Sequence, residues 1–262
     1  MPDPLLLRHD QDGIATLTLN APHSLNALSD AMLAALSDQF TVLRSDMQTR
    51  VVILRGAGRA FCAGHDLREM QAARQASDKG AAYFHDLFTR CAAVMQAIPT
   101  LPQPVVAACH GIATAAGCQL AASCDMVVSA ESTRFGVNGV NIGLFCSTPM
   151  VALTRKIPPA IAFEMLTTGA FITATRAYEV GLVNRVVPDA ELDSATLSLA
   201  HVLASKLTAA VKIGKAAFYE QQGLTLADAY AHAGKTMLDN MLWRDTEEGI
   251  AAFLEKRPPD WS

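Results

Sequence analysis

Hydrophobic and polar positions along the first 130 residues predict short strands alternating with helices. Residues 14–19 alternate with the period of a half-buried strand, and Asn20-Ala21-Pro22 ends that run. Wholly apolar runs predict three more buried strands, at 51–54, 105–108 and 126–128. Helical patterns predict helices at 29–43, 77–98 and 116–123, the first with an apolar stripe of Leu33, Leu36, Phe40 and Leu43. This repetition indicates an α/β protein with layers of both kinds of element around one core.

The pattern changes after about residue 149, where helical periodicity dominates. One further strand is expected at 182–187, and helices are expected at 160–168, 174–180, 189–206, 208–221, 225–242 and 246–255. No linker rich in Gly, Ser or Pro separates the two parts, and no repeat of 20–50 residues is visible. We therefore expect one continuous structural unit, with a core over 1–200 and a helical C-terminal region over 201–262.

Composition favours an ordinary globular protein and argues against several classes of partner. Of the 262 residues, 51% are hydrophobic and 18% are charged, which is enough apolar material for one large core. The net charge of −4 provides no basic field for nucleic acid. The six cysteines form no Cys-x-x-Cys pair and show no metal-type spacing, so we expect free, mostly buried thiols and no metal site.

Two segments bear on membranes and targeting. The first residues lack a long apolar run, and Asp3 and Asp10 argue against a transit peptide, so we expect a cytoplasmic protein. Between Arg90 and Asp125 the chain has no acidic or basic residue apart from His110, but prolines and glycines interrupt this apolar stretch. A membrane span needs about 20 continuous apolar residues, so a buried strand, loop and helix fit better. We expect no membrane partner.

Two small-residue runs carry the candidate chemistry. Residues 60–67 read Ala-Phe-Cys-Ala-Gly-His-Asp-Leu, and residues 111–125 read Gly-Ile-Ala-Thr-Ala-Ala-Gly-Cys-Gln-Leu-Ala-Ala-Ser-Cys-Asp. The first run follows a core strand and would leave backbone N–H groups free at a turn, and the alternative is a plain tight turn with Asp66 as a helix cap. The second run predicts a helix that starts near Ala116, with its first N–H groups pointing outward, although a packed alanine-rich helix explains this run equally. One N–H group from each run could together hold a developing oxyanion.

Taken together, the two runs resemble the signatures of the enoyl-CoA hydratase/isomerase (crotonase) superfamily. Residues 135–149 are most similar to its enoyl-CoA hydratase domain-containing proteins, which lack the usual catalytic glutamates. The resemblance covers nearly the whole chain. It implies a crotonase-like ββα spiral core with a helical C-terminal trimerisation region, and a homotrimer that is often doubled to a hexamer. The substrate it implies is an acyl-CoA thioester, with coenzyme A as part of the substrate and no separate cofactor.

The resemblance also assigns roles to residues. The oxyanion-hole N–H groups would be those of His65 and Ala116, where the usual pattern has Gly at position 116. Phe253 and Lys256, in the C-terminal signature, would line the CoA site of a neighbouring subunit, although a solvated cationic helix end explains Lys256 almost as well. Contacts to the CoA thioester are implied for the first run, at Ala63, Gly64, His65, Asp66 and Leu67.

Both acid/base positions of a standard hydratase are altered in this chain. Gln119 stands where the first catalytic glutamate is expected, and its amide can only hydrogen-bond, which leaves a possible polar contact. Gly139 stands at the second glutamate position and has no side chain. The ring of His65 could replace them as acid/base, but a solvated ring is the plainer expectation.

Other groups near these runs have two interpretations each. Asn138 and Asn141 could hold a water molecule, but Asn in a glycine-rich loop is more often a turn residue. Cys118 and Cys146 could be nucleophiles, but buried structural thiols are favoured because no paired base is evident. Ser147-Thr148-Pro149 predicts a helix N-terminus, which could add its dipole to the thioester site.

Three functions remain open from the sequence. The first is an enoyl-CoA hydratase or isomerase of fatty acid metabolism, a lyase with non-standard acid/base residues. The second is another acyl-CoA reaction, such as decarboxylation or thioester hydrolysis, which a Gly-His-Asp run in one decarboxylase branch of the superfamily makes conceivable. The third is a non-catalytic acyl-CoA-binding protein. We expect an acyl-CoA-binding protein whose hydratase activity is weak or altered.

Overall fold

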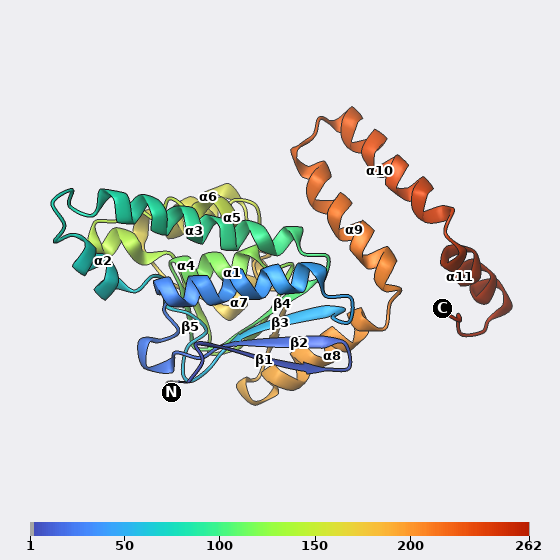
Figure 1. Ribbon diagram of the computed structural model, residues 1–262, viewed down its shortest axis with the longest axis horizontal. Coiled ribbons are helices and arrows are strands. Elements are labelled where there is room, and N and C mark those ends of the chain that lie inside the picture. Colours follow the sequence, from blue (N-terminus) through green and yellow to red (C-terminus); the bar gives the residue numbers. More distant parts are fainter. Residues whose placement is uncertain (1–2, 262) are drawn as a thin grey trace.

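A six-stranded sheet forms the centre of the molecule, for which a computed structural model describes residues 3–261 (Figure 1). Its strands lie in the order β1-β2-β3-β4-β6-β9, with β1 antiparallel to β2 and all other neighbours parallel. The strands are β1 Leu6–Gln11, β2 Ile14–Leu19, β3 Val51–Gly56, β4 Val105–Cys109, β6 Met126–Ala130 and β9 Arg185–Val187. A smaller sheet has the order β5-β7-β8, with β5 Ile112–Thr114, β7 Arg134–Gly136 and β8 Ile172–Thr173.

Helices make up most of the rest of the chain. Those up to residue 179 are α1 Asp30–Ser45, α2 Leu67–Ala73, α3 Ala81–Thr100, α4 Ala116–Ser123, α5 Pro149–Leu153, α6 Pro159–Thr168 and α7 Ala174–Glu179. The later helices are α8 Leu192–Ala204, α9 Thr208–Glu220, α10 Leu226–Met241 and α11 Arg244–Glu255. The expected apolar stripe of α1 is confirmed, because all four of its predicted residues are buried. The Ser29 side chain caps this helix by accepting from the N–H of Met32.

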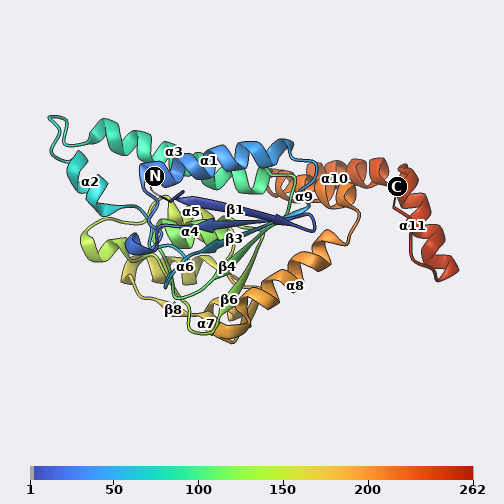
Figure 2. The same ribbon diagram turned by 60° about the horizontal axis from the view of Figure 1, so that its bottom comes forward.

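The two faces of the large sheet are covered by different helices, as Figure 2 shows. On one face, Val51 and Ile53 of β3 pack in a cluster with Leu199 and Ala200 of α8. The alternate residues of β3 belong to the main core, which also holds the buried faces of α1, α3 and α4. The period of two in the strands therefore divides the interior into two layers.

The structure differs from the sequence prediction in its shortest elements. Strands β1, β5, β7 and β8 were not expected, because each is too short or too polar to show a clear period. Helices α2 and α5 are also short, and the sequence indicated only where they begin, after Asp66 and at residues 147–149. The strand expected at 182–187 is extended only from Arg185 to Val187. Leu182 and Val183 are buried in the turn after α7, so their apolar character reflects burial and not extension.

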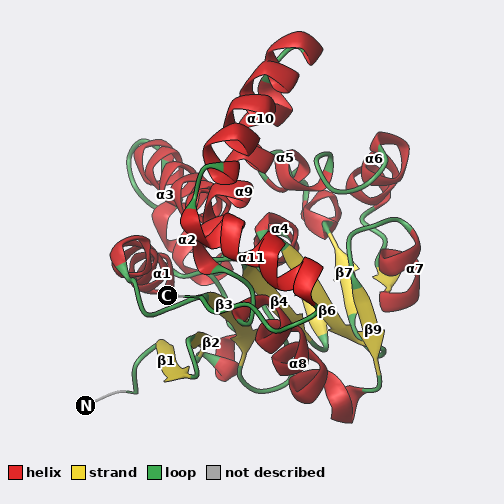
Figure 3. Ribbon diagram, turned by 90° about the vertical axis from the view of Figure 1, so that its right-hand side faces the viewer, coloured by secondary structure: helices red, strands yellow, loops and turns green. Residues whose placement is uncertain are grey.

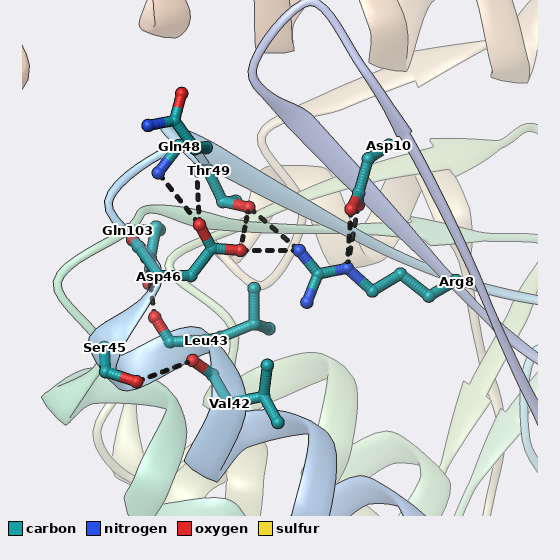
Figure 4. A network of polar contacts seen from close by, with 9 residues as sticks. All are labelled: Arg8, Asp10, Val42, Leu43, Ser45, Asp46, Gln48, Thr49 and Gln103. Atoms are coloured by element: carbon teal, nitrogen blue, oxygen red, sulfur yellow. Dashed lines mark hydrogen bonds and ion pairs between the residues drawn. The ribbon is translucent and has the colours of Figure 1, made fainter.

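Strand β1 is fastened to the end of α1 by a polar network, shown in Figure 4. The guanidinium of Arg8 donates to the Asp46 carboxylate at 2.6 Å and also pairs with Asp10. The same Asp46 carboxylate accepts from the backbone N–H groups of Gln48 and Thr49. These contacts add to the antiparallel pairing with β2 that holds this mostly exposed strand at the edge of the sheet.

Helices α9 to α11 form an arm that projects from the core (Figures 1 and 3). No residue of α10 is buried. The division expected after residue 200 falls inside α8, which still covers the sheet, and the arm begins only after Ala204. The division into two regions stays a prediction.

No single helix within residues 3–261 has the length and apolar character of a membrane span. The segments 189–204 and 208–223 pass that test only as a pair, and they are bent by 101° where they meet.

Candidate functional site

The two small-residue runs lie side by side in the structure. Cys62 bridges Ala113 in parallel fashion: its N–H donates to the carbonyl oxygen of Ile112 at 3.1 Å, and its own carbonyl accepts from Thr114 at 3.0 Å. Gly117 packs so closely that a Cβ there would lie 2.1 Å from the carbonyl oxygen of Cys62. These contacts bring together segments about 50 residues apart, as the sequence analysis expected.

The backbone N–H groups of His65 and Ala116 both lack an acceptor among the residues that the structure describes. A Cβ on Gly64, directly before His65, would lie 3.2 Å from the nitrogen of Ala116, so the two N–H groups belong to touching segments. Helix α4 begins at Ala116, and no side chain caps it. Its first N–H groups therefore stay free with the positive end of the helix dipole.

A cavity of about 310 Å³ lies over these N–H groups. Its wall is mainly apolar, with residues from both runs, from α2 and α3, and from the segment before α5. They are Ala63, His65, Leu67, Met70, Phe88, Thr114, Ala115, Ala116, Asn138, Gly139, Asn141, Ile142, Leu144, Phe145, Cys146, Ser147, Thr148 and Pro149. Gly64 and Asp66, expected as CoA contacts, lie between lining residues but are not in the wall. Asp66 caps α2 by accepting from the N–H of Arg68, so the plain capping interpretation is confirmed for its side chain.

His65 is half-buried, but its two ring nitrogens are closed off from solvent, so the expectation of a solvated ring was wrong. Both ring nitrogens are shielded from solvent and have no hydrogen-bond partner within residues 3–261. The ring lies 5.9 Å from that of Phe88, centroid to centroid. Burial lowers the pKa of His65 below its usual value, so the ring is neutral at pH 7. The apolar wall that the N-terminal part of α3 contributes causes this burial, and it could not be recognised from the turn alone.

The other polar groups of the cavity are arranged as follows. The hydroxyl of Thr114 donates to Oδ1 of Asn138 at 2.7 Å, whereas Asn141 is exposed. Cys118 is fully buried, and burial raises the pKa of its thiol to about 12. Burial also raises the pKa of Cys146, so the structure favours the inert interpretation of both thiols. Helix α5 begins at Pro149, which confirms the expected helix N-terminus beside the cavity.

Neither altered glutamate position presents a side chain to the cavity. Gln119 is 4% exposed and lies outside the cavity wall, and its Oε1 has no partner among the described residues. Its contact with a ligand stays a prediction. At Gly139, a Cβ would lie 2.3 Å from the carbonyl oxygen of Leu144 and 2.9 Å from Sγ of Cys146. The loop that follows therefore occupies the space of a side chain at position 139.

Phe253 lies in α11 and Lys256 directly follows it, and this helix stands at the far end of the arm (Figure 1). Neither residue is in the wall of the cavity. Phe253 is 82% exposed, and Lys256 ends α11 in the left-handed region with φ of 56°. One chain alone does not bring these residues to the candidate site.

Several cavity residues were not expected. Met70 and Phe88 come from α2 and α3, and nothing in their local pattern distinguishes them from ordinary core residues. Ile142 ends a short 3₁₀ helix, and Leu144 and Phe145 follow it. Apolar residues in a segment without the period of a strand or an α-helix are the signal that could have indicated a binding surface.

A larger cleft of about 410 Å³ lies elsewhere, at the ends of β2, β3 and β6. Its charged side chains and its imidazole ring already have partners: Arg55 pairs with Asp193, Asp189 accepts from the Ser132 hydroxyl, and the His110 ring lies 2.8 Å from the Gly58 carbonyl oxygen.

The fold and the site define the protein's class, a crotonase-type α/β core with a cavity over the start of a short helix. Residues 9–262 match the family model for enoyl-CoA hydratase/isomerase, and the chain belongs to this family. A crystal structure of enoyl-CoA hydratase from Mycobacterium smegmatis superposes with a TM-score of 0.95 at 51% identity, covering 99% of each chain.

Two further relatives have more specific names. Human "enoyl-CoA hydratase domain-containing protein 3, mitochondrial" is 43% identical over 251 residues, which are 96% of this chain and 81% of that protein. Its crystal structure superposes with a TM-score of 0.93 at 42% identity, covering 98% of this chain and 100% of that one. The 2,3-dehydroadipyl-CoA hydratase of Escherichia coli is 34% identical and covers 96% of each chain. The resemblance inferred from the two runs is thereby confirmed.

Proposed function

We propose that the protein binds an acyl-CoA thioester in the 310 Å³ cavity, with the thioester oxygen between the N–H groups of His65 and Ala116. The observation that carries this proposal is the pair of unpaired N–H groups on touching segments beneath an apolar cavity. Such donors stabilise negative charge that develops on a carbonyl oxygen, and they act more strongly where water is excluded. Family membership supports an acyl-CoA as the ligand.

We further propose that hydration of an enoyl-CoA is weak or altered. Addition of water needs a group that takes and returns protons near the β-carbon. Apart from the Cys146 thiol, His65 is the one titratable side chain in the cavity wall, and its shielded nitrogens are poorly placed for this task. Absence of a general acid/base typically costs about 10²–10⁴-fold in rate.

A second candidate is decarboxylation of an acyl-CoA that bears a carboxylate next to the α-carbon. This reaction breaks a C–C bond, releases CO₂ and moves the electron pair into the thioester enolate, whose α-carbon then takes a proton from water. It therefore needs the oxyanion hole and no base. The mainly apolar wall favours it, because a carboxylate is poorly solvated there. Thioester hydrolysis and non-catalytic binding remain alternatives within the same binding mode.

The assembly we propose is a homotrimer or hexamer, in which the arm of one subunit brings Phe253 and Lys256 to the CoA site of its neighbour. The exposed position of both residues supports this assignment. The cytoplasmic location expected from the sequence stays a prediction. The word mitochondrial in the names of several animal relatives favours the alternative compartment.

Calorimetry with acetoacetyl-CoA tests binding, and saturable binding is the expected result. No heat of binding at millimolar ligand would remove the oxyanion-hole assignment. A turnover panel of crotonyl-CoA, methylmalonyl-CoA and butyryl-CoA then separates hydration, decarboxylation and hydrolysis. Crotonyl-CoA hydration as fast as in an efficient hydratase would contradict the proposal of weak or altered activity.

A further inference from the structure

Asn26 is a fully buried side chain outside the cavity wall, and each polar atom of its amide is paired. Its Oδ1 accepts from the N–H of Ala21 at 2.9 Å. Its Nδ2 donates to the carbonyl oxygens of Ala57 and Ala60, at 2.8 Å each. This one amide therefore connects the turn that follows β2 to residues 57–60, which lead into the first small-residue run.

The turn around Asn26 has an unusual backbone. Leu25 and Asn26 have φ angles of 54° and 55°, in the left-handed region that most side chains avoid and asparagine tolerates best after glycine. The carbonyl of Leu25 then accepts from the N–H of Ala63 at 3.0 Å, and the N–H of Leu28 donates to the carbonyl of Gly64 at 2.7 Å. The turn thus holds the motif run on one side, while residues 110–114 hold it on the other.

The bond from Leu28 to Gly64 has a direct consequence for the neighbouring N–H group. In a planar trans peptide, the C=O and the N–H point in opposite directions. The Gly64 carbonyl faces Leu28, so the N–H of His65, in the same peptide unit, must face away from Leu28. Gly64 touches Ala116 at close range, so the other oxyanion donor is near this peptide unit. The position of the Leu28 N–H therefore sets the direction in which the His65 N–H points.

We propose that Asn26 is a positioning residue for this donor: its amide holds the turn 25–28 against the loop 57–60, and the turn holds the Gly64–His65 peptide. The proposal rests on the function proposed above for the His65 N–H. Loss of the amide lets that peptide rotate, and the His65 N–H then polarises a thioester carbonyl less. The cavity itself keeps its shape and its affinity for coenzyme A.

The test compares two ligands that differ only in the carbonyl, butyryl-CoA and its S-butyl thioether. Wild type, Asn26→Gly and Gln103→Ala are titrated with both. Asn26→Gly keeps access to the left-handed backbone and removes the whole side chain, including the amide. Gln103→Ala is the matched control, because Gln103 is also fully buried and also ties two segments together by donating to the carbonyls of Leu43 and Asp46. None of these three residues is in the cavity wall.

For wild type and Gln103→Ala we expect tighter binding of the thioester than of the thioether, and a lowered C=O stretching frequency of bound ¹³C-labelled butyryl-CoA. For Asn26→Gly we expect the preference for the thioester over the thioether to fall about tenfold, which corresponds to about 1.4 kcal/mol. The affinity for the thioether should stay unchanged, and most of the shift in the C=O stretching frequency should be lost. A general loss of stability would weaken the binding of both ligands to the same extent.

Each outcome decides a separate point. A folded Asn26→Gly protein with the full thioester preference and frequency shift overturns the positioning role and leaves the proposed function intact. A wild-type protein without preference or shift contradicts the proposed function itself. If Asn26→Gly fails to fold, Asn26→Asp decides by the same two measurements, because it keeps the shape and the Oδ1 acceptor and loses both donors.

Discussion

At the scale of single residues, Ala115 is the most strained position beside the candidate site. Its φ of 50° and ψ of −123° place an alanine where glycine is strongly favoured, directly before the Ala116 N–H group. Its own N–H donates to the Gly136 carbonyl at 2.9 Å, which helps to hold this backbone. The strained backbone at Ala115 therefore lies directly before the free N–H groups at the start of α4.

Ala115→Gly should stabilise the protein by about 1 kcal/mol. Relief of strain contributes about 1–3 kcal/mol, and the greater freedom of glycine in the unfolded chain takes back about 0.5–1 kcal/mol. Urea unfolding checks the free energy, and the melting temperature should rise by about 2–4 °C. The matched change Gly117→Ala should destabilise, since its Cβ would meet the Cys62 carbonyl at 2.1 Å. A less stable Ala115→Gly protein would show that the backbone at 115 is not strained.

At the scale of elements, helix α9 is fastened to the core by a buried ion pair. The ammonium of Lys215 lies 2.7 Å from the Asp125 carboxylate and also donates to the carbonyls of Ile98 and Gln103. Tyr219, one turn later, donates to the other oxygen of Asp125 at 2.7 Å. Asp125 also ends the second motif run, so the start of the arm is tied to the segment that builds the site.

Asp125→Asn should destabilise the protein by about 3–5 kcal/mol, because it leaves the buried Lys215 without its counter-charge. Urea unfolding measures the loss, and amide hydrogen exchange should accelerate in α9 before it does in α1. Asp125→Asn combined with Lys215→Met should cost less than Asp125→Asn alone. An equal or larger cost for the double variant would mean that the pair contributes little beyond its individual hydrogen bonds.

The contact between β1 and α1 should make stability depend on acid. The hydrogen bond from Arg8 lowers the pKa of Asp46 well below its usual 3.8 in the folded protein. Because the folded-state pKa is lowered, the contribution of Asp46 is complete above about pH 5 and is lost as the pH falls toward about 2. The difference in unfolding free energy between wild type and Asp46→Asn should therefore shrink over this range. A difference that does not change with pH would contradict the ion pair.

At the scale of the whole molecule, the arm leaves a large apolar surface uncovered. Leu226, Tyr230, Met237, Leu242, Phe253 and Leu254 are all at least 70% exposed. An apolar surface of this extent marks an association site. We expect light scattering at micromolar concentration to give the mass of a trimer or of two trimers.

Leu242→Glu should lower that mass, whereas Val42→Glu, at an exposed apolar position of the core helix α1, should not. A monomeric wild-type protein would contradict the proposed assembly. It would also leave Lys256 without its role in a neighbouring CoA site.

The sequence by itself determined the elements with a clear period and the residues of the two motif runs. The stripe on α1, the helices of the arm and the start of α4 follow from local spacing, which depends only on near neighbours in the chain. The runs around His65 and Ala116 also sufficed to recognise the family, since their small residues are needed wherever two backbones meet as closely as they do at Gly64 and Gly117.

Only the tertiary structure decided what surrounds those runs. Phe88 packs against the His65 ring from a position 23 residues later in the chain, and Leu144 fills the space beside Gly139. Neither the shielding of the ring nor the closed glutamate position therefore has a local signal. The amide of Asn26 reaches across about 30 residues of chain to hold Ala57 and Ala60. Burial and steric contact depend on distances in space between segments far apart in sequence, and a periodic pattern carries no information about those distances.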